Sequence, residues 1–277
     1  DNCAMSTGAS QNVGQLLTKR AYRDPDVEAV FEPASDRRFS FRELNSRSNQ
    51  VANALTDSGV SLGDRVGLLL MNGVEFVESF FAAGKVGAVN VPLNWRLVAD
   101  ELEFILHDAG VTVLIYGADF AEIAAELRGR GDKTAIATWI QVGGEATDGV
   151  ADYDEWIGAA SADEPVPVGA GDDLAFIMYT SGTTGLPKGV MHSHDTVLWS
   201  ILTAVATADF QAGDKYLISL PMFHVGALNP VLCCIYGGSS VTILKAFDPL
   251  RSWELIRDEK ITTTLMVPVM LQYMLAV

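Results

Sequence analysis

A short polar segment, residues 179–189, holds the residue types that bind a polyphosphate. It reads YTSGTTGLPKG, so four Ser or Thr hydroxyls, three glycines and one lysine fall within eleven residues. Glycine lets the main chain approach a ligand closely, hydroxyl and N–H groups donate to phosphate oxygens, and lysine adds a positive charge. The apolar run LAFIM at 174–178 comes directly before it. A buried strand that leads into such a loop is the usual setting of a nucleotide phosphate site.

The segment is not the P-loop of the Walker NTPases. Counted from Gly182, the pattern G-x-x-x-x-G-K-[ST] fails twice, because Pro187 replaces the second glycine and Gly189 replaces the final Ser or Thr. A Rossmann G-x-G-x-x-G is absent from the segment as well. The alternative is a Ser/Thr/Gly-rich surface linker. A linker has no need of Pro-Lys-Gly at a fixed offset, so a phosphate-binding loop is favoured.

At this segment the sequence resembles a known family. Residues 180–189 match the signature loop of the adenylate-forming (AMP-binding) enzymes, which include acyl-CoA synthetases, aryl-CoA ligases, luciferases and the adenylation domains of peptide synthetases. The resemblance covers essentially the whole chain, through FSFREL at 39–44, GAVNVPLN at 87–94 and LPMFHVG at 220–226. The sequence is most similar to the bacterial fatty-acyl-CoA synthetase branch.

The resemblance implies roles for individual loop residues. The phosphates of ATP would be bound by Thr180, Ser181, Gly182, Thr183, Thr184, Gly185 and Lys188. Thr180 would also contact Mg²⁺, and Lys188 would neutralise the leaving pyrophosphate during catalysis. For Lys188 the alternative is a solvated loop lysine, since loops lie at the surface and are more mobile than the elements they connect.

A second candidate site begins at His224, which follows the motif Pro-Met-Phe near the end of an expected strand. The resemblance places His224, Val225 and Gly226 near the substrate carboxylate and the mouth of the acyl pocket. An imidazole there can donate a hydrogen bond to the carboxylate as it attacks the α-phosphate. The alternative is a histidine satisfied in the core or capping a helix. The apolar run at 227–235 either lines an acyl tunnel or packs as an ordinary helix, and the sequence leaves both open.

The implied reaction is carboxylate activation. A fatty acid and ATP would give an acyl-adenylate and pyrophosphate, and coenzyme A would then displace AMP to form a thioester. Acyl chain length, a preference for aryl acids, and coenzyme A against a carrier protein as acceptor all stay open. The alternative from another class is a non-catalytic nucleotide- or acyl-binding fragment of such an enzyme.

Bulk composition limits the classes of partner. The chain has 277 residues, 49% of them hydrophobic, and a formal net charge of -16. A strongly acidic protein lacks the basic face that nucleic acid requires, so no nucleic-acid partner is expected. The three cysteines fit neither a disulfide framework nor a zinc site, and predict free thiols in a reducing cytoplasm. His192 and His194 have no third ligand in view, so a metal site there is rejected.

The elements that must position these residues follow from the apolar pattern. Ser40 and Glu43 form a capping box that opens a helix, which Gly59 ends. We expect further helices over 74–85 and 100–108, and strands over 65–70, 88–91, 111–116, 174–179, 216–220, 240–244 and 262–267. Alternation of strands and helices predicts an α/β fold with mainly parallel sheets. The resembling family has two such sheets packed together and flanked by helices.

Two subdomains are expected, because 143–173 is rich in Gly, Ala, Asp and Pro and 161–167 reads as an exposed connector. We predict a first α/β subdomain over 1–165 and a second over 166–277 that carries the phosphate loop. In the resembling family, a ribose-binding aspartate and a small C-terminal domain with a catalytic lysine come later. This chain is therefore expected to be the first half of an enzyme, which folds without turning over. Apolar surface at 266–277 would favour a homodimer, and peripheral membrane contact stays open.

Overall fold

The computed structural model describes residues 12–180 and 185–277, and within them the strands form two sheets. One sheet has the strand order β12-β10-β11-β1-β2, and the other has the order β7-β6-β5-β3-β4-β8-β9. The strands of the first sheet are β1 (Glu28–Glu32), β2 (Arg37–Ser40), β10 (Lys215–Ile218), β11 (Ser240–Ile243) and β12 (Thr263–Thr264). Those of the second are β3 (Arg65–Leu69), β4 (Val89–Pro92), β5 (Val111–Gly117), β6 (Thr138–Val142), β7 (Ala151–Asp152), β8 (Leu174–Thr180) and β9 (Lys188–Ser193).

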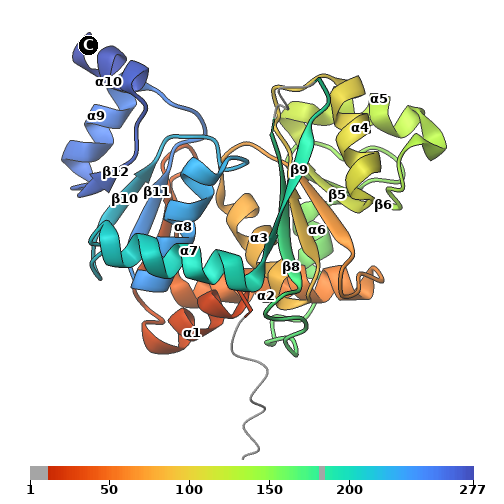
Figure 1. The fold of residues 1–277 in the computed structure, drawn as a ribbon, viewed down its shortest axis with the longest axis horizontal. Helices are drawn as coiled ribbons and strands as arrows, with labels where there is room; N and C mark the ends of the chain where they lie inside the picture. The colour runs from red at the N-terminus through yellow and green to blue at the C-terminus, as the bar shows by residue number, and fades with distance from the viewer. Residues whose placement is uncertain (1–11, 181–184) are drawn as a thin grey trace, which may run out of the picture.

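Neighbouring strands are parallel except for two pairs, β1 with β2 and β8 with β9. The helices of the described chain are α1 (Gln15–Arg23), α2 (Phe41–Asp57), α3 (Val74–Lys85), α4 (Ala99–Ala109), α5 (Ala121–Gly129), α6 (Tyr153–Gly158), α7 (His194–Thr207), α8 (Val225–Gly237), α9 (Pro249–Asp258) and α10 (Pro268–Leu275). Figure 1 shows α3 between the two sheets and α4 and α5 on the far side of the seven-stranded one. The helix α8 packs against β10 and β11 of the five-stranded sheet, and α7 packs against α8 and against β8 and β9. The expected fold class, packed mainly parallel sheets flanked by helices, is confirmed.

Local sequence explains how several helices begin. The predicted capping box opens α2, where the Glu43 N–H donates to Ser40 Oγ at 3.3 Å and the Ser40 N–H donates to Glu43 Oε2 at 2.8 Å. The helix α3 is apolar on nearly all sides, which is typical of a helix covered on every face. Every residue of α3 except Glu75 is buried.

The Gly-, Ala-, Asp- and Pro-rich segment 143–173 is more structured than its composition suggests, because it contains β7 and α6 ahead of the predicted connector at 161–167. Asp152 caps α6 by accepting from the Glu155 N–H at 3.0 Å, and the helix buries its own residues Tyr153 and Ile157. One turn and a half of helix is too short to show a period in the sequence. Each of the two sheets contains strands that come before residue 165 and strands that come after it. The division at 165/166 stays a prediction, and neither sheet is confined to one of the two parts.

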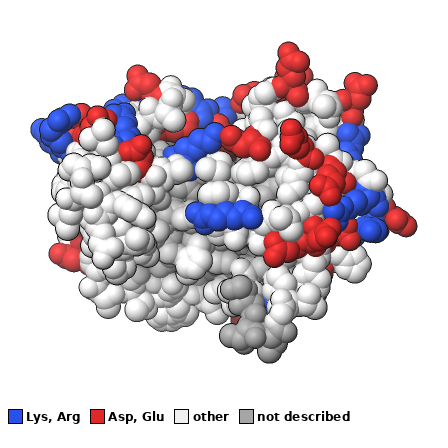
Figure 2. Space-filling model, turned by 90° about the horizontal axis from the view of Figure 1, so that it is seen from above, with Lys and Arg blue, Asp and Glu red and all other residues white. Residues whose placement is uncertain are grey.

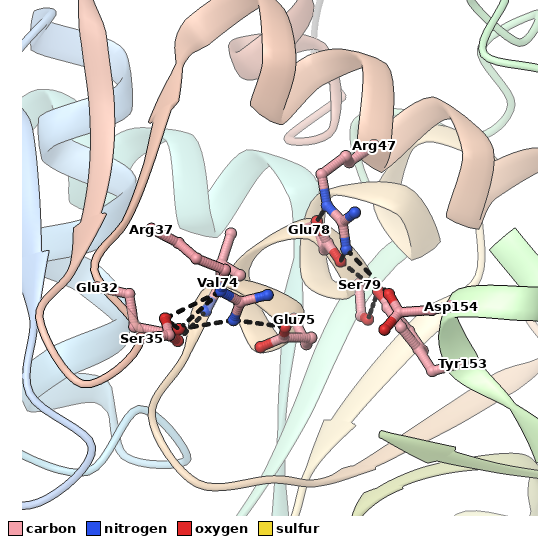
Figure 3. Close-up of polar contacts among 10 residues, drawn as sticks. All are labelled: Glu32, Ser35, Arg37, Arg47, Val74, Glu75, Glu78, Ser79, Tyr153 and Asp154. Carbon is pink, nitrogen blue, oxygen red and sulfur yellow. Dashed lines mark hydrogen bonds and ion pairs between the residues drawn. The ribbon is translucent and has the colours of Figure 1, made fainter. Parts of the chain in front are cut away.

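A buried carboxyl group joins α3 to α2 and α6. Glu78 is fully buried, accepts from Arg47 at 2.7 and 2.9 Å, and accepts from the Tyr153 hydroxyl at 2.7 Å (Figure 3). Burial raises the pKa of Glu78, although the Arg47 guanidinium opposes that shift. Figure 3 also shows a neighbouring network in which Arg37 bridges Glu32 and Glu75 at the start of the same helix.

Replacing Tyr153 by phenylalanine should lower the free energy of unfolding by about 1 to 3 kcal/mol, because a buried carboxyl group loses one of its donors. Urea unfolding followed by circular dichroism measures this change. Tyr22→Phe is the matched control, since Tyr22 is 89% exposed and surface changes usually stay within about 0.5 kcal/mol. Equal stability of the two variants would contradict a role for the Tyr153 hydroxyl.

A buried lysine holds the connector against the helical layer. Lys85 Nζ donates to Glu164 Oε1 at 2.8 Å, and also to Asn45 Oδ1 at 2.8 Å and Asn49 Oδ1 at 2.6 Å. The main chain at 161–164 is exposed as predicted, but the Glu164 carboxylate reaches the fully buried lysine. Burial lowers the pKa of Lys85 to about 8, although the hydrogen bond with Glu164 opposes it.

This lysine gives an expected pH dependence. In the unfolded chain its pKa is near an ordinary lysine value of about 10.4, so between about pH 8 and pH 10 the unfolded chain keeps a proton that the folded chain has released. Stability therefore rises with pH across that window. We expect wild type to gain about 2 kcal/mol relative to Lys85→Met between pH 8 and pH 10. Chemical denaturation across this range measures it, and parallel pH profiles would contradict it.

Candidate nucleotide and acyl site

The antiparallel pair β8–β9 presents two of the predicted phosphate ligands at the end where the chain connects the two strands. Thr180 is the last residue of β8 and Lys188 the first of β9, and they face each other in the strand register. Both residues are exposed. Gly185 has a φ of +111°, a backbone conformation that L side chains rarely adopt. The other predicted ligands, 181–184, lie outside the described residues.

The next pair along the hairpin, Tyr179 and Gly189, is tightly packed. A Cβ on Gly189 would lie 2.8 Å from Ile177 Cγ2 and 3.1 Å from Tyr179 Cζ, so only glycine fits there. The Tyr179 hydroxyl donates to Asp108 Oδ2 of α4 at 2.6 Å. Burial raises the pKa of Tyr179, and Asp108 adds to the shift. The strand β9 itself was missed in the sequence, because its first four residues are all exposed and carry no apolar alternation.

His224 caps the helix α8. Its ring Nδ1 accepts from the Gly226 N–H at 3.1 Å, and its main-chain N–H donates to the Pro221 carbonyl at 3.1 Å. His224 thus caps α8, as the alternative expected, and the cap uses only one ring nitrogen, so its contact with a substrate carboxylate stays a prediction. In the neutral ring, an accepting Nδ1 places the proton on Nε2. The exposed imidazole thus has one N–H with which to donate to a ligand.

The segment before His224 rests on the loop after β4. The Phe223 ring meets the Trp95 ring edge-on with centroids 6.0 Å apart, and the Arg96 guanidinium lies 4.3 Å from the centre of Trp95. Sequence reasoning assigned no role to Trp95 or Arg96. The two residues support the main chain that carries His224.

A small apolar cavity, about 180 Å³, lies between the hairpin and the helices α7 and α8. Its lining residues are Phe176, His192, Thr196, Val197, Ser200, Val225, Leu228, Asn229 and Leu232. The run at 227–235 forms part of α8 and packs into the core, as one of its two alternatives expected. Leu228 and Leu232 also line the cavity, and the lining of an acyl tunnel stays a prediction.

His192 was considered only as a metal ligand in the sequence, yet it forms a wall of this cavity. Its ring stacks on Phe176 with centroids 4.4 Å apart, and burial lowers its pKa. His194 is fully buried, and its Nδ1 accepts from the Val13 N–H at 3.0 Å. In the part of the chain that the structure describes, no three or more His, Cys, Asp or Glu side chains are grouped to hold a metal ion. A larger groove, about 980 Å³, lies between α1 and α7 and includes neither Lys188 nor His224.

The outer surface divides by charge. Figure 2 shows Lys and Arg interspersed with Asp and Glu along the upper edge and the right side, and an uncharged expanse on the left. Apolar side chains of α10 are exposed at that end of the molecule, including Leu271 at 50%, Tyr273 at 58% and Leu275 at 82%. No helix among the described residues is long and apolar enough to cross a membrane.

Residues 17–277 match the family model of the AMP-binding enzymes, and the chain belongs to that family. It is 41% identical over 265 residues to the long-chain-fatty-acid–CoA ligase FadD13 of Mycobacterium tuberculosis, covering 95% of this chain and 51% of that protein. It is 35% identical over 266 residues to a feruloyl-CoA synthase of Amycolatopsis sp., covering 95% of this chain and 50% of that protein.

Solved structures agree with this assignment. The inhibitor-bound N-terminal domain of FACL13 from Mycobacterium tuberculosis superposes with a TM-score of 0.90 at 40% identity, covering 96% of this chain and 65% of that one. The chain spans about half the length of the curated relatives it matches.

Proposed function

We propose that this chain is the nucleotide- and acyl-binding part of a fatty-acid–CoA ligase. A carboxylate oxygen of the fatty acid attacks the α-phosphorus of ATP, and pyrophosphate leaves. The sulfur of coenzyme A then attacks the acyl carbon of the adenylate, and AMP leaves with the bonding electrons. The chain's part in the first step is positioning and charge neutralisation.

One observation carries the proposal. The hairpin that ends in Thr180 and Lys188 also forms, four residues back on each strand, the Phe176–His192 wall of the apolar cavity. The cavity's other side is the start of α8, which His224 caps. A polar phosphate loop, an N–H donor and an apolar pocket on adjoining elements suit a substrate with an anionic head and an apolar tail.

The proposed roles follow that arrangement. Phosphate oxygens of ATP are bound by Thr180, Ser181, Gly182, Thr183, Thr184, Gly185 and Lys188. The Thr180 hydroxyl is a hard oxygen ligand of the kind Mg²⁺ accepts, and the nucleotide's phosphates complete such a site. His224 donates from Nε2 to the substrate carboxylate, and Val225 and Gly226 line the mouth of the acyl cavity. Coenzyme A is the proposed acceptor in the second step.

Acid-dependent exchange of pyrophosphate into ATP tests this function. The assay uses a longer polypeptide, which carries these 277 residues followed by the half of the family's length that they do not span. A panel of saturated acids of rising length and of aryl acids such as ferulate shows which acids the pocket accepts. We expect no exchange without acid, because no adenylate forms. We expect exchange with fatty acids, because burial of the acyl chain contributes about 0.8 kcal/mol for each CH₂. Exchange that ignores the acid would contradict the proposal.

A non-catalytic nucleotide- or acyl-binding fragment is the second candidate. The apolar cavity and the exposed residues Thr180 and Lys188 suit binding of such ligands with or without a reaction. Binding of ATP and of a fluorescent fatty acid to the 277-residue chain, measured beside pyrophosphate exchange, separates the two. Binding without exchange supports the fragment, whereas exchange by the chain alone excludes it.

The charge and the exposed apolar residues of the surface bear on the compartment and the partners of the protein. We propose a cytoplasmic protein whose partner is a small carboxylic acid and not a nucleic acid, given the net charge of -16. The exposed apolar face of α10 supports a homodimer, which sedimentation velocity measures. Leu275→Glu, at a position 82% exposed, should shift any dimer toward monomer. Flotation with liposomes tests membrane contact in the same variants.

A further inference from the structure

Asn72 connects the two sheets through its side-chain amide. It follows β3, and its Nδ2 donates to the Leu220 carbonyl at 2.9 Å and to the Leu244 carbonyl at 3.0 Å. Its Oδ1 accepts from the Met222 N–H at 2.8 Å. The residue is only 6% exposed. Leu220 and Leu244 come just after β10 and β11, so one amide joins the carboxyl ends of three strands from both sheets.

The chemistry of these contacts is specific to asparagine. Both N–H groups of the amide and its oxygen are used, and each partner is a main-chain group. An aspartate offers no donor when ionised, and a leucine offers neither donor nor acceptor. One side chain thereby binds three main-chain groups that lie 148, 150 and 172 positions away in sequence.

The main chain that Asn72 holds is the one that leads into His224. Met222 is bound to the amide, Phe223 rests on Trp95, and the His224 N–H donates back to the Pro221 carbonyl. A shift of the Met222 N–H therefore moves a turn whose last residue is His224. We infer that Asn72 is a positioning residue, which fixes the segment 220–222 and through it the imidazole of His224 relative to the acyl cavity. The inference rests on the proposed function.

Loss of this amide should loosen the segment without unfolding the molecule. Asn72 lines a polar cavity of about 460 Å³ at the carboxyl ends of the strands. Water from that cavity can then reach the abandoned carbonyls, and a polar space of this size readily holds it. The effect is therefore expected at 220–224 and not across the sheets.

Hydrogen exchange of the 277-residue chain tests the positioning directly, with Asn72→Ala and the near-isosteric Asn72→Asp. We expect the Met222 amide to exchange at least about tenfold faster in Asn72→Ala, since its acceptor is lost. In Asn72→Asp the acceptor stays, so the Met222 amide should exchange more slowly than in Asn72→Ala. Unchanged protection of Met222 in Asn72→Ala would overturn the inference.

Asn12→Ala is the matched control. Asn12 is buried, its Nδ2 donates to the carbonyls of Gly84, Val168 and Gly169, and its Oδ1 accepts from the Gly14 N–H. Like Asn72, it donates to main-chain carbonyls and accepts from a main-chain N–H, but it holds Gly84 and the residues just after the connector and not the His224 segment. Its replacement should leave the Met222 amide protected. Equally fast exchange of the Met222 amide in Asn12→Ala and Asn72→Ala would show a general loss of stability and overturn the inference.

Kinetics in the larger polypeptide described above test the consequence. We expect Asn72→Ala to lower kcat/KM for the acid by about tenfold or more, because misplaced groups lose effective molarity, while KM for ATP changes less than about threefold. Asn12→Ala should change neither. Faster exchange at Met222 with an unaltered kcat/KM for the acid would overturn the role of Asn72. Absence of acid-dependent turnover in wild type refutes the proposed function and, with it, a positioning role in that reaction.

Discussion

Replacing Lys188 by alanine is expected to slow adenylate formation by about 10² to 10³-fold, the loss seen when one preorganised charge-stabilising group is removed. Lys188 lies opposite Thr180 at the connected end of the hairpin and is exposed. Its ammonium can therefore reach a phosphate group without crossing the core. Because negative charge develops on pyrophosphate as it leaves, the contact is strongest in the transition state of the first half-reaction. The second half-reaction has no pyrophosphate and should be nearly unchanged.

Single-turnover kinetics of the two half-reactions measure this difference. Thiolysis of a preformed acyl-adenylate by coenzyme A serves as the internal comparison. Lys133→Ala is the matched control, since Lys133 is an exposed lysine of a surface turn, 62% accessible, away from the hairpin. Equal losses in both half-reactions would remove Lys188 from the pyrophosphate role. An unchanged rate of adenylation would leave it as a solvated loop lysine.

Replacing His224 by alanine is expected to lower the adenylation rate by about 10²-fold, with a much smaller change in ATP affinity. The physical reason is that Nδ1 is engaged by the Gly226 N–H, so Nε2 carries the proton of the neutral ring and can donate to the carboxylate. The imidazole acts on the acid and not on the nucleotide, so binding of ATP should survive.

His224→Asn separates the two uses of this side chain. Asparagine is a good helix N-cap and keeps an acceptor for the first turn of α8, but it lacks the ring nitrogen that points away from the cap. We expect Asn to recover the thermal stability lost in Ala, by about 1 kcal/mol, without recovering the adenylation rate. Recovery of both would assign His224 to the helix alone. Loss of ATP binding in the Asn variant would place it in the nucleotide site.

Local features of the sequence were enough to determine most elements and the chemistry of the loop. The Ser40–Glu43 pair begins α2 because two side chains satisfy free N–H groups within one turn. The helix predicted over 74–85 is α3, Val74–Lys85. The strand predicted over 65–70 is β3, Arg65–Leu69, since continuous apolar residues suit a strand buried on both faces. The phosphate loop is a contiguous motif, so its residue types and spacing are visible without any fold.

Only the tertiary structure decided which of these elements lie together. Nothing local shows that β1 and β2 join β10, β11 and β12, because their pairing bridges about 200 residues of chain. The contact of Lys85 with Glu164 spans 79 positions, and those of Asn72 span 148 to 172. His192 reads as a lone histidine until β9 folds it onto Phe176 as a cavity wall. Such contacts depend on loop closures that the sequence does not display, whereas caps, periods and motifs depend on neighbours within a few residues.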